Sequence, residues 1–559
     1  MRDEMKDSRL FVHPSSLRPQ PLGYFSLILH AHLPFVRHPE HPEFLEEDWL
    51  YEAITEVYLP LIFIFQSLHE SGASPRLAMN VSPPLCEMLS DSLLQERYTR
   101  HLENLLALAR KEVARTAREL PQFRAAARMY ADTLGAAWLL WNERYGRNLV
   151  RAFRELQDEG VVEIITCGAT HGFLPLISTP EARRAQVEVA VANYRKHFGR
   201  QPRGIWLPEC AYEPGIEKLL ADAGIEYFIS DTHAILYGEP RPRYGVYAPV
   251  RCPNGVAVFA RDLETSQQVW SSVVGYPGHA SYREFYRDLG WDAPLDYLLP
   301  HLHADGNRRH LGLKYHRISG KDVSQQDKLP YDPEAARRRV AVDASHFINE
   351  RIKQAARLRE TFQGRPPLVV SPYDAELYGH WWFEGPQFLD FVFRKLYYDK
   401  EAIEAITPGD FLDSGIPIQT QQPSASSWGE DGYYKVWLNE ANAWMYPHQH
   451  AAEERMTALA NRHTTPDALT YRALNQAARE LLLAESSDWA FQIYQGTTVE
   501  YASRRFRSHI RRFNALAEEI ERAAIDHDRL AEMESRDNIF AEMDYRIYRS
   551  RQLAVGSSQ

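Results

Sequence analysis

The sequence predicts an α/β barrel of about seven β-α units, extended by a helical insertion and an all-helical C-terminal domain. Short apolar runs recur up to residue 371, helical patterns separate most of them, and polar residues follow each run. The runs are continuously apolar rather than alternating, which is typical of strands buried on both faces of a parallel sheet. Because such barrels place their active sites at the carboxyl ends of the strands, these polar residues mark the predicted site.

The predicted strands are short and rich in apolar and β-branched residues. They are YFSLIL (24–29), RLAMNV (76–81), VVEIIT (161–166), RGIWLP (203–208), EYFIS (226–230), VAVFA (256–260) and PLVVS (367–371). Between them, residues 48–72 and 215–224 carry helical periodicity, and the first of these helices ends at Gly72.

Two further regions lie outside a minimal barrel. Residues 87–157 have the pattern of several helices inserted between the second and third strands, and the polar stretch 305–333 is expected to run over the barrel mouth. After about Lys400 no strand signal returns, whereas 467–483 and 503–523 have amphipathic helical periods. The predicted parts are a polar extension (1–22), the catalytic barrel with its insertion (23–400), a helical domain completing the cleft (401–548) and a tail (549–559).

Composition excludes several classes of protein. Of the 559 residues, 44% are hydrophobic and 25% charged, as in a folded globular protein. Lys and Arg number 64 against 75 Asp and Glu, and the net charge of −11 argues against a nucleic-acid partner. No apolar run approaches about 18 residues, so no membrane partner is expected. The first residues lack an apolar signal segment and the four cysteines are widely spaced, which favours the cytoplasm and argues against a Cys-ligated zinc site.

Aromatic residues are abundant, at 12% of the chain, and 22 histidines accompany them. A large core or a carbohydrate site could account for them, since sugar faces stack on aromatic rings, and composition leaves both interpretations open. The tryptophans of interest are Trp206, Trp270, Trp381, Trp382, Trp428 and Trp437, several of which lie in or beside Gly- and Pro-rich loops where a core role is harder to argue.

Histidines gather at the predicted strand ends. His30 and His32 flank Ala31 and face the same side of a strand, and His171 and His233 follow other strands. Metal-dependent hydrolases with barrel folds begin with the same H-x-H pattern, so a metal site is one hypothesis. The alternative is a set of hydrogen-bonded structural histidines.

Two carboxylates follow different strands. Glu209 ends the run WLPE, and Asp374 lies in SPYDAELYGHWWFEGP. Carboxylates from two strands aimed at one cleft suit glycoside hydrolysis or transfer, in which one attacks the anomeric carbon and the other exchanges a proton. The alternative is that each pairs with a basic group such as Arg261 to hold the barrel mouth together. Phosphate-binding loops and a G-x-S-x-G nucleophile elbow are absent from the sequence.

Several long motifs, in order, carry a family resemblance. HAHLPF, GATHGFLP, WLPECAY, YDAELYGHWWFEGP and SSWGEDGYYKVWLN resemble the signature regions of glycoside hydrolase family 57, and most closely its 1,4-α-glucan branching-enzyme subgroup. The resemblance runs from about Gly23 to about Tyr548 and includes SSDWAFQIYQGTTVEYASRRFRSHIRRF, which is typical of that subgroup.

The resemblance implies an incomplete (β/α)7 barrel and a retaining mechanism, with Glu209 as nucleophile and Asp374 as general acid/base. It implies no metal and no cofactor. The retaining mechanism predicts that the two carboxyl groups lie roughly 5–6 Å apart, and the nearby nucleophile is expected to raise the pKa of Asp374. The residues expected to bind substrate are His30, His32, His171, Arg261, Trp270, Trp428, Trp437 and Tyr244.

Tyr244 is expected at the tip of a gating loop, GEPRPRYGVYAP (238–249), with Tyr237 and Tyr247 as rivals. The implied activity is cleavage of an α-1,4-glucan and transfer of the chain to a 6-hydroxyl, in glycogen or α-glucan synthesis. An α-amylase-like hydrolase or a 4-α-glucanotransferase on the same fold is the alternative. A metal-dependent hydrolase using the strand-end histidines, and a glucan-binding protein with a decayed site, remain as other classes, and the oligomeric state stays open.

Overall fold

The computed structural model describes residues 21–271, 274–398 and 402–551. The predicted N-terminal extension and C-terminal tail therefore lie outside the described residues, except for 21–22 and 549–551. Within the described ranges, none of the helices combines the length and the apolar character needed to cross a membrane.

Parallel strands form the barrel, and each of the seven predicted strands is present. One sheet has the order β3-β2-β1-β8 and the second includes β7-β5-β4. A bridge between Thr166 and Ile205 joins β3 to β4, and the Asp262 N–H donates to the Val370 carbonyl over 2.9 Å beside β7 and β8. At the first junction Thr166 donates to the Gly204 carbonyl and accepts from the Trp206 N–H, so a few hydrogen bonds join the two sheets into an incomplete barrel. The strands are β1 (Gly23–Ala31), β2 (Leu77–Val81), β3 (Val162–Ile165), β4 (Gly204–Trp206), β5 (Tyr227–Ser230), β7 (Ala257–Ala260) and β8 (Leu368–Asp374).

Helices connect the strands along the outside of the barrel. The predicted helix at 48–72 is α1 (Glu47–Ala53) and α2 (Leu59–Glu70), joined by one π-helical turn. The helix α7 (Pro180–Phe198) shows why the chain folds this way locally, because the Thr179 side chain caps its first turn and Gly199, at φ 70°, ends it. The other connecting helices are α8 (Ile216–Asp222), α9 (Thr232–Leu236), α10 (Leu263–Trp270), α13 (Pro333–Thr361) and α14 (Gly385–Tyr398).

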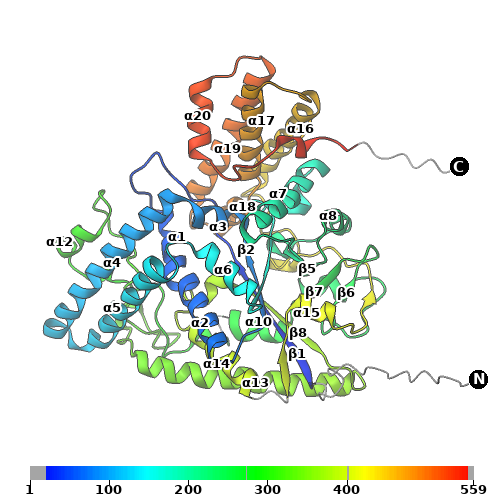
Figure 1. The fold of residues 1–559 in the computed structure, drawn as a ribbon. Helices are drawn as coiled ribbons and strands as arrows, with labels where there is room; N and C mark the ends of the chain where they lie inside the picture. The colour runs from blue at the N-terminus through cyan, green and yellow to red at the C-terminus, as the bar shows by residue number, and fades with distance from the viewer. Residues whose placement is uncertain (1–20, 272–273, 399–401, 552–559) are drawn as a thin grey trace, which may run out of the picture.

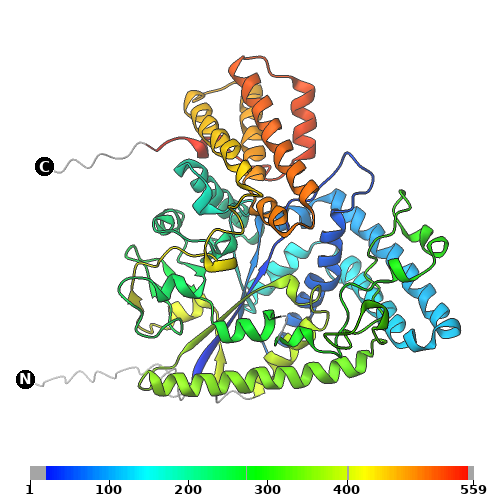
Figure 2. The same cartoon turned by 180° about the vertical axis from the view of Figure 1, so that it is seen from behind.

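The helices inserted between β2 and β3 divide into two groups: the two longest stand beside the barrel, whereas the first and last pack against it (Figure 1). They are α3 (Pro83–Ser90), α4 (Ser92–Glu119), α5 (Arg124–Leu139) and α6 (Leu149–Asp158). The excursion that contains 305–333 packs against this insertion, as Figure 2 shows. Asn104 donates to the His301 carbonyl over 3.2 Å, and the rings of Phe123 and His316 lie 4.8 Å apart.

The C-terminal helices stand over the end of the barrel toward which β1 and β8 run (Figure 1). They are α16 (Tyr446–Arg462), α17 (Ala468–Ala484), α18 (Ser487–Gln495), α19 (Val499–Glu521) and α20 (His527–Arg536). The prediction that no strand follows Lys400 is wrong. The strands β9 (Ile403–Ala405) and β10 (Gln419–Thr420) pair with β1 and with β6 (Val250–Arg251), and at two or three residues they are too short to give a periodic signal.

Candidate active site

Glu209 lies in a tight turn directly after β4. Its backbone is in the left-handed region, at φ 61°, which is uncommon for a residue with a side chain and often marks a functional site. The carboxylate accepts hydrogen bonds from the Trp428 indole Nε1 at 2.9 Å and from the Ser487 hydroxyl at 2.9 Å. Burial raises the pKa of Glu209 to about 7 and the negative Asp488 adds to this, whereas the two donors oppose it. Glu209 is thus held close to its ionisation point near neutral pH.

Asp374 ends β8, where the strand register places it opposite His30 of β1. Burial holds the pKa of Asp374 well above its ordinary value, and the negative charges of Glu376 and Glu209 raise it further, against the opposing charge of Arg261. The expected direction is confirmed, although burial is a larger cause than the partner carboxylate. The 5–6 Å separation of the two carboxyl groups stays a prediction. A carboxyl whose pKa is held high and a second whose pKa is about 7 suit the acid and nucleophile roles in cleavage of a glycosidic bond.

Three of the four predicted strand-end histidines, His30, His32 and His171, form one group, here called the histidine cluster. His30 Nε2 lies 3.0 Å from His171 Nε2, and the ring of His32 stacks on that of His171 at 4.0 Å between centroids. One of the two facing nitrogens must donate and the other accept, and burial lowers the pKa of both His30 and His171 well below the usual value. His233 lies apart, bonded to Asp231 at 3.3 Å and to the Gly432 carbonyl at 2.6 Å.

The metal hypothesis can be tested against these contacts. Among the described residues, two groupings that include the histidine cluster have donor atoms close enough to share an ion, namely His30 with Cys167 and His171, and His32 with His171 and Asp488; a third, of Glu480, His509 and Asp537, lies in the C-terminal part. An ion bound through Nε2 of His30 or His171 would have to replace the hydrogen bond between them. The donor atoms are therefore already engaged with one another, which favours the interpretation as hydrogen-bonded polar residues around a substrate pocket.

The C-terminal helix α18 supplies side chains that the motifs did not single out. The Ser487 hydroxyl lies 2.9 Å from His171 Nδ1 as well as bonding Glu209, and Asp488 Oδ2 lies 3.1 Å from His32 Nε2. Asn80 was missed as well, although the register of β1 and β2 pairs it with His30, whose Nδ1 lies 2.6 Å from its side-chain oxygen. Helix α18 thus contributes side chains to the group around Glu209.

Arg261 forms an ion pair with Asp231, and its charge lowers the pKa of Asp374. Trp428 and Trp270 leave aromatic surface near loops, and Trp270 is 39% exposed at the end of α10. The structure contradicts the prediction that Trp437 contacts the substrate. Trp437 is 1% exposed and packs on Phe173 at 4.6 Å between centroids, so it supports the loop and offers no face to a sugar.

The structure also contradicts the prediction that Tyr244 gates the site. Its ring packs edge-on against Phe362 at 5.2 Å, and the Arg365 guanidinium lies 4.4 Å above it. Both partners precede Leu368, the first residue of β8, so Tyr244 lies about 20 Å from the Asp374 end of that strand. The loop turns back along the barrel wall to reach β6, which carries its tyrosine away from the site. Tyr237, 58% exposed with its ring 6.4 Å from His233, lies at the correct end.

Comparison with known proteins gives a consistent result. Residues 26–351 match the family model described as glycosyl hydrolase family 57, and residues 448–548 match the C-terminal model of 1,4-alpha-glucan branching enzymes. The chain is 37% identical to a 1,4-alpha-glucan branching enzyme of Thermococcus kodakarensis over 93% of its own length and 77% of the relative's.

Two solved structures are similar over nearly the whole chain. The crystal structure of the alpha-amylase AmyC of Thermotoga maritima has a TM-score of 0.89 and 42% identity, covering 95% of this chain and 99% of that one. The branching enzyme of T. kodakarensis has a TM-score of 0.85 and 36% identity, covering 95% and 97% of the two chains.

Proposed function

Because the chain belongs to glycosyl hydrolase family 57, we propose that it is a retaining 1,4-α-glucan branching enzyme, which cuts an α-1,4-glucan and rejoins the released chain as an α-1,6 branch. The observation that carries this proposal is the participation of α18 in the site. That helix lies in the part of the chain that matches branching-enzyme C-terminal domains, and its Ser487 donates to Glu209.

In the first step the Glu209 carboxylate attacks the anomeric carbon of an α-1,4 linkage. The bond from that carbon to O4 breaks, and the Asp374 proton passes to O4 of the departing chain. A glycosyl ester on Glu209 results. The raised pKa of Asp374 favours its protonated form, while the donors Trp428 and Ser487 stabilise the ionised form of Glu209.

In the second step the Asp374 carboxylate accepts the proton of a 6-hydroxyl from another glucan chain. The 6-oxygen attacks the anomeric carbon, the ester bond to Glu209 breaks, and two inversions leave the α configuration unchanged. If water takes the place of the 6-hydroxyl, the product is a free reducing end. Exclusion of water from the site therefore determines the ratio of transfer to hydrolysis.

The histidine cluster, Asp488 and Arg261 are proposed to hold the sugar ring between the two carboxyl groups. Asp488 and His32 form a polar pair at 3.1 Å whose remaining hydrogen-bonding capacity suits sugar hydroxyls. Trp270 and Trp428 are proposed to stack on glucosyl rings farther along the chain. In place of Tyr244, Tyr237 is the tyrosine that we propose to gate the mouth.

The test is product analysis on amylose before and after debranching. Branching predicts new α-1,6 linkages with little gain in reducing ends, and a Glu209→Gln variant should lose both signals. The second candidate, an α-amylase-like hydrolase, is favoured by the similarity to the T. maritima amylase, which is named for hydrolysis. It predicts that reducing ends rise without α-1,6 linkages.

We further propose a role in the synthesis of glycogen or a related α-glucan in the cytoplasm. Cys86, Cys167, Cys210 and Cys252 are free and buried, as is common in proteins of reducing compartments. Fractionation of cells that produce the protein tests the compartment, and the branching of their stored glucan tests the role.

A further inference from the structure

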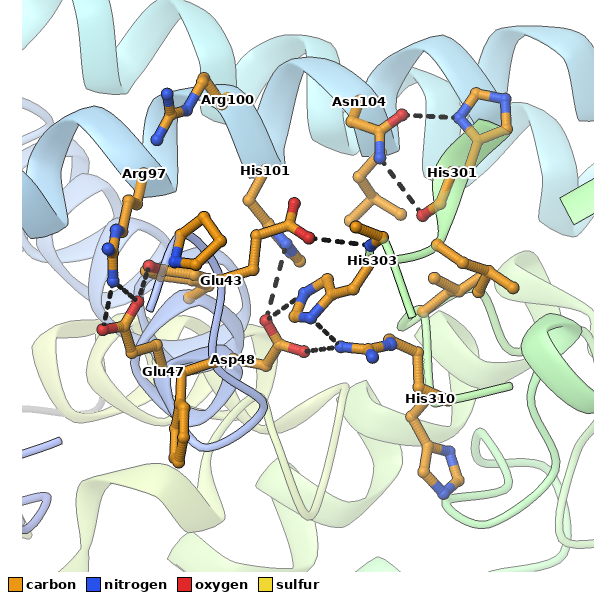
Figure 3. Close-up of a pocket in the computed structure, with 18 of the residues that line it drawn as sticks. Glu43, Glu47, Asp48, Arg97, Arg100, His101, Asn104, His301, His303 and His310 are labelled. Atoms are coloured by element: carbon orange, nitrogen blue, oxygen red, sulfur yellow. Dashed lines mark hydrogen bonds and ion pairs between the residues drawn. The ribbon is translucent and has the colours of Figure 1, made fainter. Parts of the chain in front are cut away.

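A large cavity lies outside the site described above, between α1, the insertion helix α4 and the segment around His303 (Figure 3). Its volume is about 830 Å³, within the range of pockets that bury most of a small organic ligand or an oligosaccharide of a few units. None of the catalytic candidates lines it. We propose that this cavity, here called the insertion pocket, is a second α-glucan-binding site that anchors the polymer; the inference rests on the proposed action on α-glucan.

The strongest sign of a ligand is an unsatisfied carboxylate oxygen. Asp48, on the first turn of α1, is 8% exposed, and its Oδ1 has no hydrogen-bond partner among the described residues. His303 Nε2 lies 3.5 Å and His101 Nδ1 4.0 Å from that oxygen; these are the ion-pair contacts that Figure 3 marks, and neither is a hydrogen bond. Figure 3 shows the carboxylate at the centre of the lining side chains. Because a buried acceptor that lacks a hydrogen bond is costly, a ligand hydroxyl that donates to it would be bound favourably.

The charges of the lining favour a neutral ligand. Glu47 pairs with Arg97 at 2.7 Å, and Arg309 lies 3.5 Å from the other Asp48 oxygen. At the rim Arg100 faces Glu96 at 3.6 Å. Since acids and bases are matched in this way, a phosphate or a cation would gain little net attraction. A polyhydroxylated neutral ligand can donate to carboxylates and accept from arginine, histidine and asparagine without breaking the pairs.

The remaining wall is apolar and aromatic. Phe44, held by stacking on His38 at 3.7 Å between centroids, lines the pocket together with leucines from α4 and from the 302–311 segment. Sugar rings present an apolar face with hydroxyls at the edge. The apolar wall can contact the face of such a ring, and the planar polar groups beside it can bond the hydroxyls. Polar recognition and an apolar platform occur together here, as a carbohydrate site requires.

Packed aromatic rings connect the wall of the insertion pocket to helix α18, which carries Asp488. Trp49 of α1 and Phe44 both lie near Tyr501, at 5.7 and 6.3 Å between ring centroids, and Tyr501 contacts Trp489, the neighbour of Asp488. We expect a long glucan to engage the pocket and the catalytic cleft together, whereas a short one occupies a single site at a time. Two linked contacts raise affinity for the polymer without changing the chemistry of transfer.

The test fills the pocket without removing an internal contact. Ala304 is an exposed lining residue, and Ala304→Trp places an indole in the cavity, whereas Ala107→Trp on α4 adds the same bulk at an exposed position that does not line it. Both are made in a Glu209→Gln background, and amylose binding is measured by retardation in native gels. The expected result is that Ala304→Trp raises the dissociation constant about tenfold and Ala107→Trp leaves it unchanged.

Arg100→Ala, at an exposed side chain, is a second variant in case the tryptophan disturbs folding, and it should weaken binding several-fold. With Glu209 restored, Ala304→Trp should raise KM for amylose and leave turnover of maltoheptaose unchanged. Unchanged amylose binding in both pocket variants would overturn the proposal. If the parent protein binds amylose through this pocket yet forms no α-1,6 linkages, the branching function fails and the binding site stands.

Discussion

Replacing Trp428 by phenylalanine tests how the site controls the ionisation of Glu209. The indole N–H donates to Glu209 over 2.9 Å, and this residue is only 9% exposed, so water is poorly placed to substitute for the lost donor. A hydrogen bond to a charged group contributes about 1.5–3 kcal/mol, and one pKa unit corresponds to about 1.4 kcal/mol. The loss of this donor should therefore raise the pKa that governs the nucleophile by about 1–2 units.

The assay is the pH dependence of kcat/KM on amylose. Because the nucleophile must be ionised to attack, the acid limb of the profile should move to higher pH, and activity well below that limb should fall about 10–100-fold. The apparent pKa read from this limb belongs to Glu209 and Asp374 together, because the two carboxyl groups titrate as a coupled pair. Trp437→Phe is the matched control, since its indole N–H has no hydrogen-bond partner in the described part of the chain. An acid limb that stays in place in Trp428→Phe would refute the reasoning.

Three further results are expected. Full activity should persist in EDTA, because the facing nitrogens of the histidine cluster already bond each other; loss of activity with metal release would revive the metal hypothesis. Gly429→Ala should lower the free energy of unfolding by about 1–3 kcal/mol in denaturant titrations, since a Cβ there would lie 2.6 Å from the Trp437 ring, and unchanged stability would contradict this packing. Tyr237→Ala should increase hydrolysis relative to branching, whereas Tyr244→Ala should not; the reverse pattern would return the gate to Tyr244.

Local patterns in the sequence were enough to predict the barrel. Each of its parallel strands is a continuous apolar run, and Glu209 and Asp374 follow such runs directly, so position along a strand placed them at the catalytic end. The two short strands after Lys400 were missed, because two or three residues carry no period.

The rest of the site depends on contacts between distant segments. Ser487 and Asp488 reach the barrel from a helix more than 270 residues beyond Glu209, and no spacing rule connects them. The sequence also could not predict which tryptophan side chains are exposed. A tryptophan in or beside a glycine-rich loop can face outward, as Trp270 does, or inward, as Trp437 does. The prediction for Tyr244 failed because the sequence does not show in which direction its loop turns.

The assignment of Glu209 as the residue that carries the glycosyl group is the centre of this account, and covalent trapping tests it most directly. A 5-fluoro-α-glucosyl fluoride slows breakdown of the ester, so the labelled protein can be digested and its peptides weighed. The account predicts one added glycosyl unit on the peptide that contains Glu209, and none in Glu209→Gln. A label on the peptide that contains Asp374 and Glu376, or turnover with inversion at the anomeric carbon, would contradict it.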